Sequence, residues 1–156
     1  MKVIAIREHP ERGSDLADAV HSRAQLHDVL PQADFVVLAA PLTAETRHII
    51  NADALAAMRP DSYLINVSRG PLIDDDALIA ALRSGRIAGA ALDVFAEEPL
   101  PAGSPYWALP NVLITPHTAA VTEKLWVRHF ALISENLKRF LADQPLRGLV
   151  DKSRGY

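Results

Sequence analysis

Short apolar runs recur along the chain at intervals that leave room for a helix between them. Continuous runs of this length are typical of β-strands that are covered on both faces. We therefore expect five buried strands, each separated from the next by other structure. The runs are Val3–Ile6, Phe35–Ala40, Tyr63–Val67, Ala90–Phe95 and Val112–Thr115.

Helical periodicity fills two of the gaps between these runs. In residues 51–58 apolar positions repeat at helical spacing after Asn51, a residue type that caps a first turn. Residues 74–85 begin with three aspartates, carry Arg83 near the end and finish at Gly85, which suits the helix dipole and a glycine C-terminus. Strands that alternate with helices through short connections predict an α/β fold with a doubly wound parallel sheet.

The end of the chain carries a different pattern. One amphipathic helical pattern runs from Val121 to Leu141 with at most one interruption. We therefore divide the chain into a Rossmann-like domain at 1–120 and a C-terminal helix with a tail at 121–156. The last ten or so residues are expected to be poorly ordered, since chain ends are ordered only where something holds them.

Composition narrows the class of partner. The 156 residues are 49% hydrophobic and 22% charged, with a net charge of −3, which fits one soluble domain with a core. A mild negative charge without basic runs argues against nucleic acid as a partner, and no apolar run is long enough to cross a membrane.

There is no cysteine, and the six histidines lack metal-ligand spacing, so we expect no metal site. Without cysteines or a signal peptide the expected location is the cytoplasm.

Three residues with useful chemistry stand at or near the ends of predicted strands. Arg69 and His117 each follow an apolar run, and Asp93 lies inside one. Doubly wound sheets bind ligands at the carboxyl ends of their strands, where an arginine can bind a carboxylate and a histidine can exchange a proton. A buried aspartate needs a donor, which is either a ligand amide or a backbone N–H.

Each of these residues alone also fits a structural role. Arg69 fits a strand cap that faces water, and a histidine at a strand end is more often structural than catalytic. Their occurrence at three successive strand ends of one sheet favours a functional site.

Longer stretches of the sequence resemble the D-isomer-specific 2-hydroxyacid dehydrogenases over nearly the whole chain. The resemblance is carried by "NVSRG" at 66–70, "EEPLP" at 97–101 and "TPHTAA" at 115–120. It implies that Arg69 binds the substrate, that His117 is the acid and base, and that Glu98 orients His117. The implied reaction is hydride transfer between NAD(P)H and a small 2-oxo acid such as glyoxylate or hydroxypyruvate, in a homodimeric enzyme.

The resemblance also implies the residues of the cofactor site. Asp93 matches the family's contact to the nicotinamide carboxamide. Arg7 stands where members that use NAD carry an acidic residue, and an arginine there suits the 2′-phosphate of NADP. Because Glu8 follows at once and can hold ribose hydroxyls, NAD stays open beside NADP. The other residues assigned to the cofactor are Pro41, Leu42, Thr46, Val67, Ser68 and Ala119.

Two features of the family's nucleotide domain are missing from the sequence. The phosphate-binding pattern G-x-G-x-x-G is absent, and Met1 falls where the second strand of that domain begins. We therefore expect a sheet that lacks its central first strand, with Val3–Ile6 deprived of its normal neighbour and two edges unpaired.

Two hypotheses about the whole chain follow. In the first it is the C-terminal part of a dehydrogenase and is inactive as an isolated fragment. In the second it is a catalytically inactive truncated chain that acts as a binding or interaction module. The intact set of Arg69, Glu98 and His117 favours the first hypothesis, and the missing glycine loop favours the second.

Overall fold

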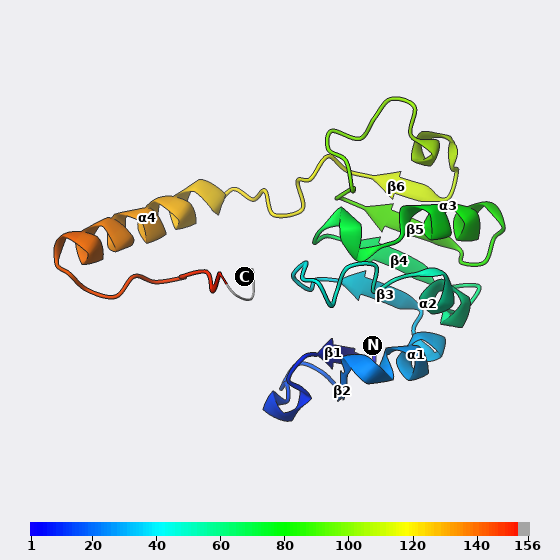
Figure 1. The fold of residues 1–156 in the computed structure, drawn as a ribbon, viewed down its shortest axis with the longest axis horizontal. Helices are drawn as coiled ribbons and strands as arrows, with labels where there is room; N and C mark the ends of the chain where they lie inside the picture. Colours follow the sequence, from blue (N-terminus) through cyan, green and yellow to red (C-terminus); the bar gives the residue numbers. More distant parts are fainter. Residues whose placement is uncertain (153–156) are drawn as a thin grey trace.

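The computed structural model describes residues 1–152, and residues 153–156 lie outside the described part. Parallel strands alternate with helices along the chain, which confirms the predicted α/β class (Figure 1). The strands are β1 (Ile4–Arg7), β2 (Ala19–Ser22), β3 (Phe35–Leu38), β4 (Tyr63–Asn66), β5 (Gly89–Leu92) and β6 (Val112–Ile114). The α-helices are α1 (Leu26–Val29), α2 (Ala52–Ala57), α3 (Asp75–Arg83) and α4 (Leu125–Leu141).

The strands form two separate parallel sheets. One has four strands in the order β3-β4-β5-β6, and the other is the pair β1-β2. Strand β2 pairs with β1 in parallel, with Ala19 opposite Ile4. The first strand therefore has a neighbour that the sequence analysis did not predict. Among the described residues, no strand pairs with the other edge of β1 or with the edge of β3 that faces away from β4. The two predicted unpaired edges are therefore present.

Helices α2 and α3 both begin with the expected side-chain caps. Oδ1 of Asn51 accepts the N–H of Ala54 at 2.9 Å, and Oδ1 of Asp74 accepts the N–H of Ala77 at 3.1 Å. The second helix ends before Gly85, whose φ of 69° lies in the left-handed region that ends helices. The two helices lie side by side, and together they cover one face of the four-stranded sheet (Figure 1).

The core lies between that face and the helices, and the other face is open. Phe35, Val37, Tyr63 and Leu113 are 60%, 57%, 45% and 64% exposed, so the expectation of strands covered on both faces is wrong for β3, β4 and β6. The rings of Phe35 and Tyr63 stack on this open face with centroids 5.8 Å apart. The largest fully buried apolar side chains are Leu30, Ile50, Leu55, Met58, Leu64, Leu72, Leu78 and Ile87.

Helix α4 extends away from the α/β body and has no buried residue (Figure 1). It is uninterrupted, but it begins at Leu125 instead of Val121, because residues 118–124 form turns in which Thr118 and Thr122 carbonyls accept N–H bonds. Trp126 in its first turn is 75% exposed. In residues 1–152 no helix combines the length and the apolar character needed to cross a membrane.

The tail folds back along this helix. The N–H of Arg147 donates to Oδ1 of Asn136 at 2.9 Å, and Nδ2 of Asn136 donates to the Arg147 carbonyl at 3.0 Å. The expected disorder of the last ten or so residues stays a prediction, and the part of it on residues 153–156 lies outside the described chain. The division of the chain at residue 120 stays a prediction.

Candidate active site

Arg69 lies in the turn between the carboxyl end of β4 and the short 3₁₀ helix η4 (Gly70–Leu72). The fully buried Asn66 shapes this turn, because its Nδ2 donates to the Arg69 carbonyl at 2.9 Å and its Oδ1 accepts the Ser68 N–H at 3.1 Å. The Arg69 side chain is exposed, and its Nη1 donates to the Ser68 carbonyl at 2.6 Å. Since a guanidinium carries five N–H donors, further donors are available for a ligand.

A glycine brings this turn close to the segment that follows β5. A Cβ on Gly70 would lie 2.0 Å from the carbonyl carbon of Phe95 and 2.3 Å from the nitrogen of Ala96. No other residue type fits this contact without a backbone shift. The close approach places Arg69 near enough to Glu98 for its charge to act on that carboxylate.

Glu98 and His117 form a hydrogen-bonded pair between the loop after β5 and the turn after β6. Nδ1 of His117 donates to Oε2 of Glu98 at 2.7 Å, and Oε1 of Glu98 accepts the N–H of Phe95 at 2.9 Å. These bonds, together with the nearby His117 and Arg69 charges, hold the pKa of Glu98 below its usual value against the effect of burial. Glu98 is therefore an anion that fixes the ring of His117 through Nδ1 and leaves Nε2 for a ligand.

Asp93 follows β5 directly and is 4% exposed. Its Oδ1 accepts from Thr115 Oγ1 at 2.5 Å and from Thr118 N–H at 2.9 Å, and its Oδ2 accepts from Ala119 N–H at 2.9 Å. Burial acts to raise the pKa of Asp93, but the bonds from Thr115, Ala119 and Thr118 outweigh it, so the pKa is lowered. These partners include the backbone N–H donors that the sequence left open, and the contact of Asp93 to a ligand amide stays a prediction.

The backbone of His117 is unusual, and Asp93 helps to hold it. His117 has φ 54°, in the left-handed region that residues with a side chain rarely adopt. Its N–H donates to the Asp93 carbonyl at 2.8 Å and to the Thr115 carbonyl at 3.1 Å. Asp93 thus binds the turn that carries His117 through both its carbonyl and its carboxylate.

Apart from these contacts, a cavity opens beside the carboxyl ends of β1 and β3, and it is called the second cavity below. Its volume is about 620 Å³, and three arginines and one histidine line it against two glutamates. Nη1 of Arg7 donates to the Gly13 carbonyl in the loop after β1. The lining side chains are Ile6, Arg7, Glu8, His9, Arg12, Arg23, Pro41, Thr43, Glu45, Thr46 and Ile49, with Ala39 and Ala40.

The predicted site residues fall into two groups. Arg69, Asp93, Glu98, His117 and Ala119 are brought together by the contacts described above, whereas Arg7, Pro41 and Thr46 line the second cavity.

Ser68 connects the two groups, because its hydroxyl donates to the carbonyl of Ala40 in the cavity wall. Leu42 packs against the core instead of lining the cavity. Val67 is 44% exposed, and its N–H donates to the Leu38 carbonyl.

Several residues of the site escaped the sequence reasoning. Asn66 and Thr115 shape the turns of Arg69 and His117, and Arg12 and Arg23 share the cavity with Arg7. A polar side chain that closes an apolar run, as Asn66 does, is the pattern that would have indicated the first of these. Within the described chain, no group of three or more His, Asp or Glu residues is placed to hold a metal ion.

Comparison with known proteins identifies the family. Residues 1–119 match the family described as D-isomer specific 2-hydroxyacid dehydrogenase, NAD binding domain. The chain belongs to this family. Glyoxylate/hydroxypyruvate reductase A of Klebsiella pneumoniae is 42% identical over 134 residues, which make up 86% of the chain and 42% of that protein.

Two solved structures of family members superpose well on the chain. The NADPH-dependent glyoxylate/hydroxypyruvate reductase of Sinorhizobium meliloti, in complex with NADP and sulfate, has a TM-score of 0.86 at 34% identity, over 100% of this chain and 50% of that one. The D-isomer specific 2-hydroxyacid dehydrogenase of Xanthobacter autotrophicus Py2, in complex with NADPH and MES, has a TM-score of 0.84 at 37% identity, over 100% of this chain and 73% of that one. These comparisons confirm the Rossmann-like fold and the family prediction.

The chain is much shorter than its curated relatives. It spans 42% of the Klebsiella reductase and 51% of an uncharacterized protein of Corynebacterium melassecola that is 42% identical. The activity of a whole reductase is therefore a proposal for this chain.

Proposed function

We propose that this chain carries the catalytic residues of a reductase that transfers hydride from NADPH to a small 2-oxo acid such as glyoxylate or hydroxypyruvate. The observation that carries the proposal is the bond of 2.7 Å between His117 and Glu98, close to Arg69 at the carboxyl edge of the sheet. The activities named for the Klebsiella and Sinorhizobium relatives support the choice of substrate. A homodimer is the expected assembly of the complete enzyme.

The three residues divide the work on the substrate. Arg69 binds the carboxylate and stabilises the negative charge that develops on the carbonyl oxygen. His117 donates a proton from Nε2 to that oxygen, and Glu98 holds the ring in place through Nδ1. When bound, the reduced nicotinamide supplies the hydride.

The residues present fit one end of a nicotinamide dinucleotide. Arg7, Arg12 and Arg23 line a cavity at the carboxyl ends of β1 and β3, where a ribose 2′-phosphate would meet positive charge. Glu8 and Glu45 in the same wall can serve ribose hydroxyls. The glycine pattern that cradles the diphosphate is not in the sequence, so this chain supplies only part of the cofactor site.

The test uses the native protein captured from its own cells with an antibody against this chain. Its intact mass and its oxidation of NADPH with glyoxylate or hydroxypyruvate are measured beside the purified 156-residue chain. We expect activity in a species about twice 17.0 kDa and none in the isolated chain. A native species of 17.0 kDa without activity would support the interaction module instead.

A further inference from the structure

Tyr106 is a buried titratable side chain that the proposed reaction does not use. It lies in the short 3₁₀ helix η5 (Pro105–Ala108) between β5 and β6 and is 3% exposed. Its hydroxyl donates to Oδ1 of Asp75, in the first turn of α3, at 2.7 Å. Because the two residues are 31 positions apart in the sequence, this bond fastens the segment between β5 and β6 to the helix layer.

The Tyr106 hydroxyl keeps its proton for this bond. Burial and the bond to Asp75 raise the pKa of Tyr106 well above its ordinary value, so the phenol is neutral at physiological pH. A hydrogen bond to a carboxylate is shorter and stronger than one between neutral groups. We therefore expect its removal to have a measurable effect on the segment that Tyr106 carries.

The ring of Tyr106 packs on Phe95, the residue whose backbone holds Glu98. The two ring centroids are 5.8 Å apart, with the ring planes tilted by 55°. Phe95 is 8% exposed, and its N–H donates to Oε1 of Glu98 at 2.9 Å. The other oxygen of this carboxylate, Oε2, accepts from Nδ1 of His117 at 2.7 Å. These contacts form one continuous series from Asp75 to His117.

The loop after β5 also folds against the segment that carries Tyr106. The carbonyl of Pro101 accepts the N–H of Ser104 and Nε1 of Trp107, both at 2.9 Å. Oγ of Ser104 in turn accepts the N–H of Tyr106 at 3.4 Å. Glu98 lies only three residues before Pro101. Tyr106 is therefore a point at which the loop of Glu98 is attached to the rest of the molecule.

We propose that Tyr106 is a positioning residue of the candidate active site. Its bond to Asp75 holds the loop in which Glu98 lies, and Glu98 then sets the direction of the His117 ring. The catalytic meaning of this role rests on the proposed function, because His117 donates a proton only in that reaction. The arrangement itself belongs to the chain and can be measured without substrate or cofactor.

The variant Tyr106→Phe separates this role from a role in stability alone. It keeps the aromatic ring against Phe95 and removes only the hydroxyl. If the bond served stability alone, the molecules that stay folded would still hold His117 through Nδ1, because Glu98 is unchanged. If the bond positions Glu98, the ring of His117 changes in the folded chain.

Nitrogen NMR of the His117 ring in the purified 156-residue chain is the test. In a neutral imidazole, the hydrogen bond of one nitrogen decides which nitrogen carries the proton, and the two ring shifts report the result. We expect the proton on Nδ1 in the original chain, where Glu98 accepts it. In Tyr106→Phe we expect both ring shifts to move towards those of a free histidine. Exchange of the Phe95 amide, which donates to Glu98, should quicken by about tenfold or more.

Two substitutions of Asp75 give a matched pair that leaves Tyr106 in place. Asp75→Ala removes the acceptor of the hydroxyl, whereas Asp75→Asn keeps an amide oxygen that can accept the same bond. We expect Asp75→Ala to change the His117 shifts as Tyr106→Phe does, and Asp75→Asn to retain those of the original chain. This pair keeps the proposal testable if Tyr106→Phe does not fold.

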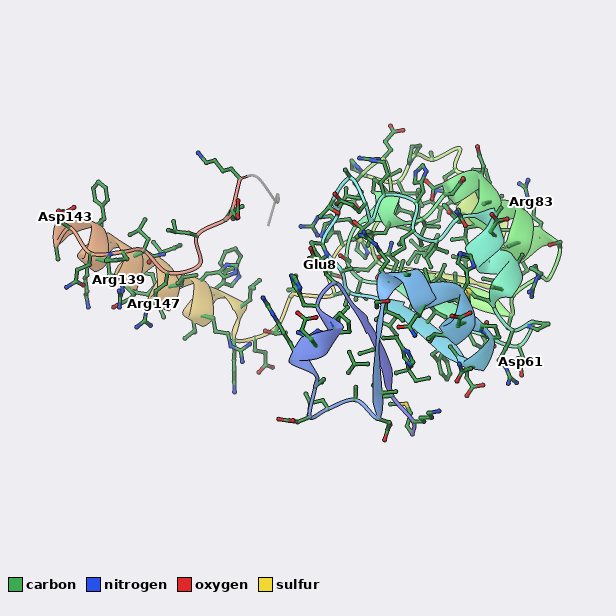
Figure 2. All side chains as sticks on the ribbon, turned by 60° about the horizontal axis from the view of Figure 1, so that its bottom comes forward. Glu8, Asp61, Arg83, Arg139, Asp143 and Arg147 are labelled. Carbon is green, nitrogen blue, oxygen red and sulfur yellow. The ribbon has the colours of Figure 1, made fainter. Side chains whose placement is uncertain are left out.

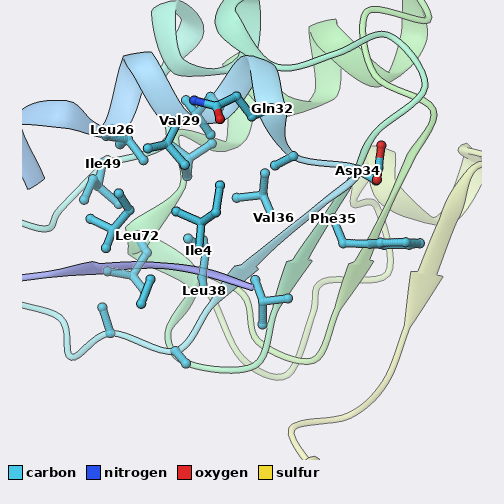
Figure 3. Close-up of a pocket in the computed structure, with 18 of the residues that line it drawn as sticks. Ile4, Leu26, Val29, Gln32, Asp34, Phe35, Val36, Leu38, Ile49 and Leu72 are labelled. Atoms are coloured by element: carbon cyan, nitrogen blue, oxygen red, sulfur yellow. The ribbon is translucent and has the colours of Figure 1, made fainter. Parts of the chain in front are cut away.

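Val36→Ala is the control for a general loss of stability. With Ile4 and Leu38, Val36 lines an apolar groove between β1 and β3 (Figure 3), and it packs against the core. Strand β3 is the edge of the four-stranded sheet opposite β6, so this variant loosens the core far from the loop after β5. We expect the His117 ring shifts to stay as they are in the original chain.

Two results would overturn the proposed role of Tyr106. One is an unchanged His117 ring in Tyr106→Phe and Asp75→Ala, and the other is an equal change in Val36→Ala. None of these measurements involves turnover, so the failure of this proposal and the failure of the proposed function are separate results.

Discussion

Asp93 accepts hydrogen bonds from the turn that carries His117, and these bonds hold the backbone of that turn in place. The carboxylate accepts three bonds from Thr115, Thr118 and Ala119. Without these three bonds the left-handed backbone of His117 would be held by fewer contacts. Asp93 can therefore control the position of His117, the proposed proton donor.

Replacement of Asp93 by asparagine tests this role. An amide can accept only through one atom, so one of the backbone N–H groups of Thr118 and Ala119 would face an NH₂ group, which should cost about 1–3 kcal/mol of unfolding free energy. In the complete enzyme we expect kcat to fall more than KM rises, because His117 is displaced while Arg69 is not. A drop in cofactor affinity alone would instead indicate a direct contact between Asp93 and the nicotinamide.

The proton donor itself is tested by His117→Ala in the complete enzyme. General-acid catalysis of this kind contributes about 10²–10⁴-fold, so kcat/KM should fall by that factor while the Kd of NADPH stays nearly unchanged. Stopped-flow turnover and fluorescence titration of NADPH measure the two quantities. Near-normal turnover would show that another group donates the proton.

Glu98 predicts how the stability of the chain responds to acid. Its bonds to His117 and Phe95 lower the pKa of Glu98, so the folded chain binds this proton less tightly than the unfolded chain does. The resulting stabilisation is present above the unfolded pKa of about 4.3 and is lost as the pH falls through the lower folded value. Urea unfolding of Glu98→Gln should therefore show a smaller loss of stability on acidification than the original chain. An identical pH dependence would contradict the lowered pKa.

The turn after β4 shows how one small residue brings two elements together. A Cβ at Gly70 would stand 2.0 Å from the backbone of Phe95, so Gly70→Ala forces the β4 and β5 turns apart. We expect a loss of about 3 kcal/mol or more in unfolding free energy, measured by urea denaturation. Gly103→Ala is the matched control, because nothing lies within 4 Å of its added methyl group. Equal effects of the two substitutions would show that the close contact does not matter.

Features that depend on residues close together in the sequence, such as helix caps, could be predicted from local patterns. The caps at Asn51 and Asp74 could be read directly, because their partners lie three residues along the chain. Strand β2 was missed, because its sequence AVHS carries two polar residues in four and its burial is only partial. The open sheet face was missed for the opposite reason, since an apolar run such as Phe35–Ala40 looks the same whether one or both of its faces are covered.

The resemblance implied one contact of the candidate site, between Glu98 and His117, but it did not indicate the partners of Asp93. Arg69, Glu98 and His117 could be named from the resemblance, and the bond of Glu98 to His117 is present at 2.7 Å. The partners of Asp93 lie 22 to 26 residues further along the chain, where no local pattern indicates them. Only the packing of β5 beside β6 brings them together.

Charge in the second cavity predicts which cofactor the complete enzyme prefers. Arg7, Arg12 and Arg23 line this cavity, and a 2′-phosphate would be attracted to them. We expect a lower KM for NADPH than for NADH, and Arg7→Ser should raise the KM for NADPH while leaving that for NADH nearly unchanged. Steady-state kinetics with both cofactors measures this, and an NADH preference in the original enzyme would contradict it.

The exposed positions of the two tryptophans allow binding to be followed by intrinsic fluorescence. Trp107 and Trp126 are 54% and 75% exposed, and the sequence contains no others. Their emission in the isolated chain should therefore be that of indole in water. Trp126 lies in α4, outside the α/β body, so in a Trp107→Phe variant a blue shift on mixing with another protein would report that this helix has been covered, with no dye attached. Figure 2 shows how much of that helix is available for such an event, because its side chains project into solvent on a segment separate from the body.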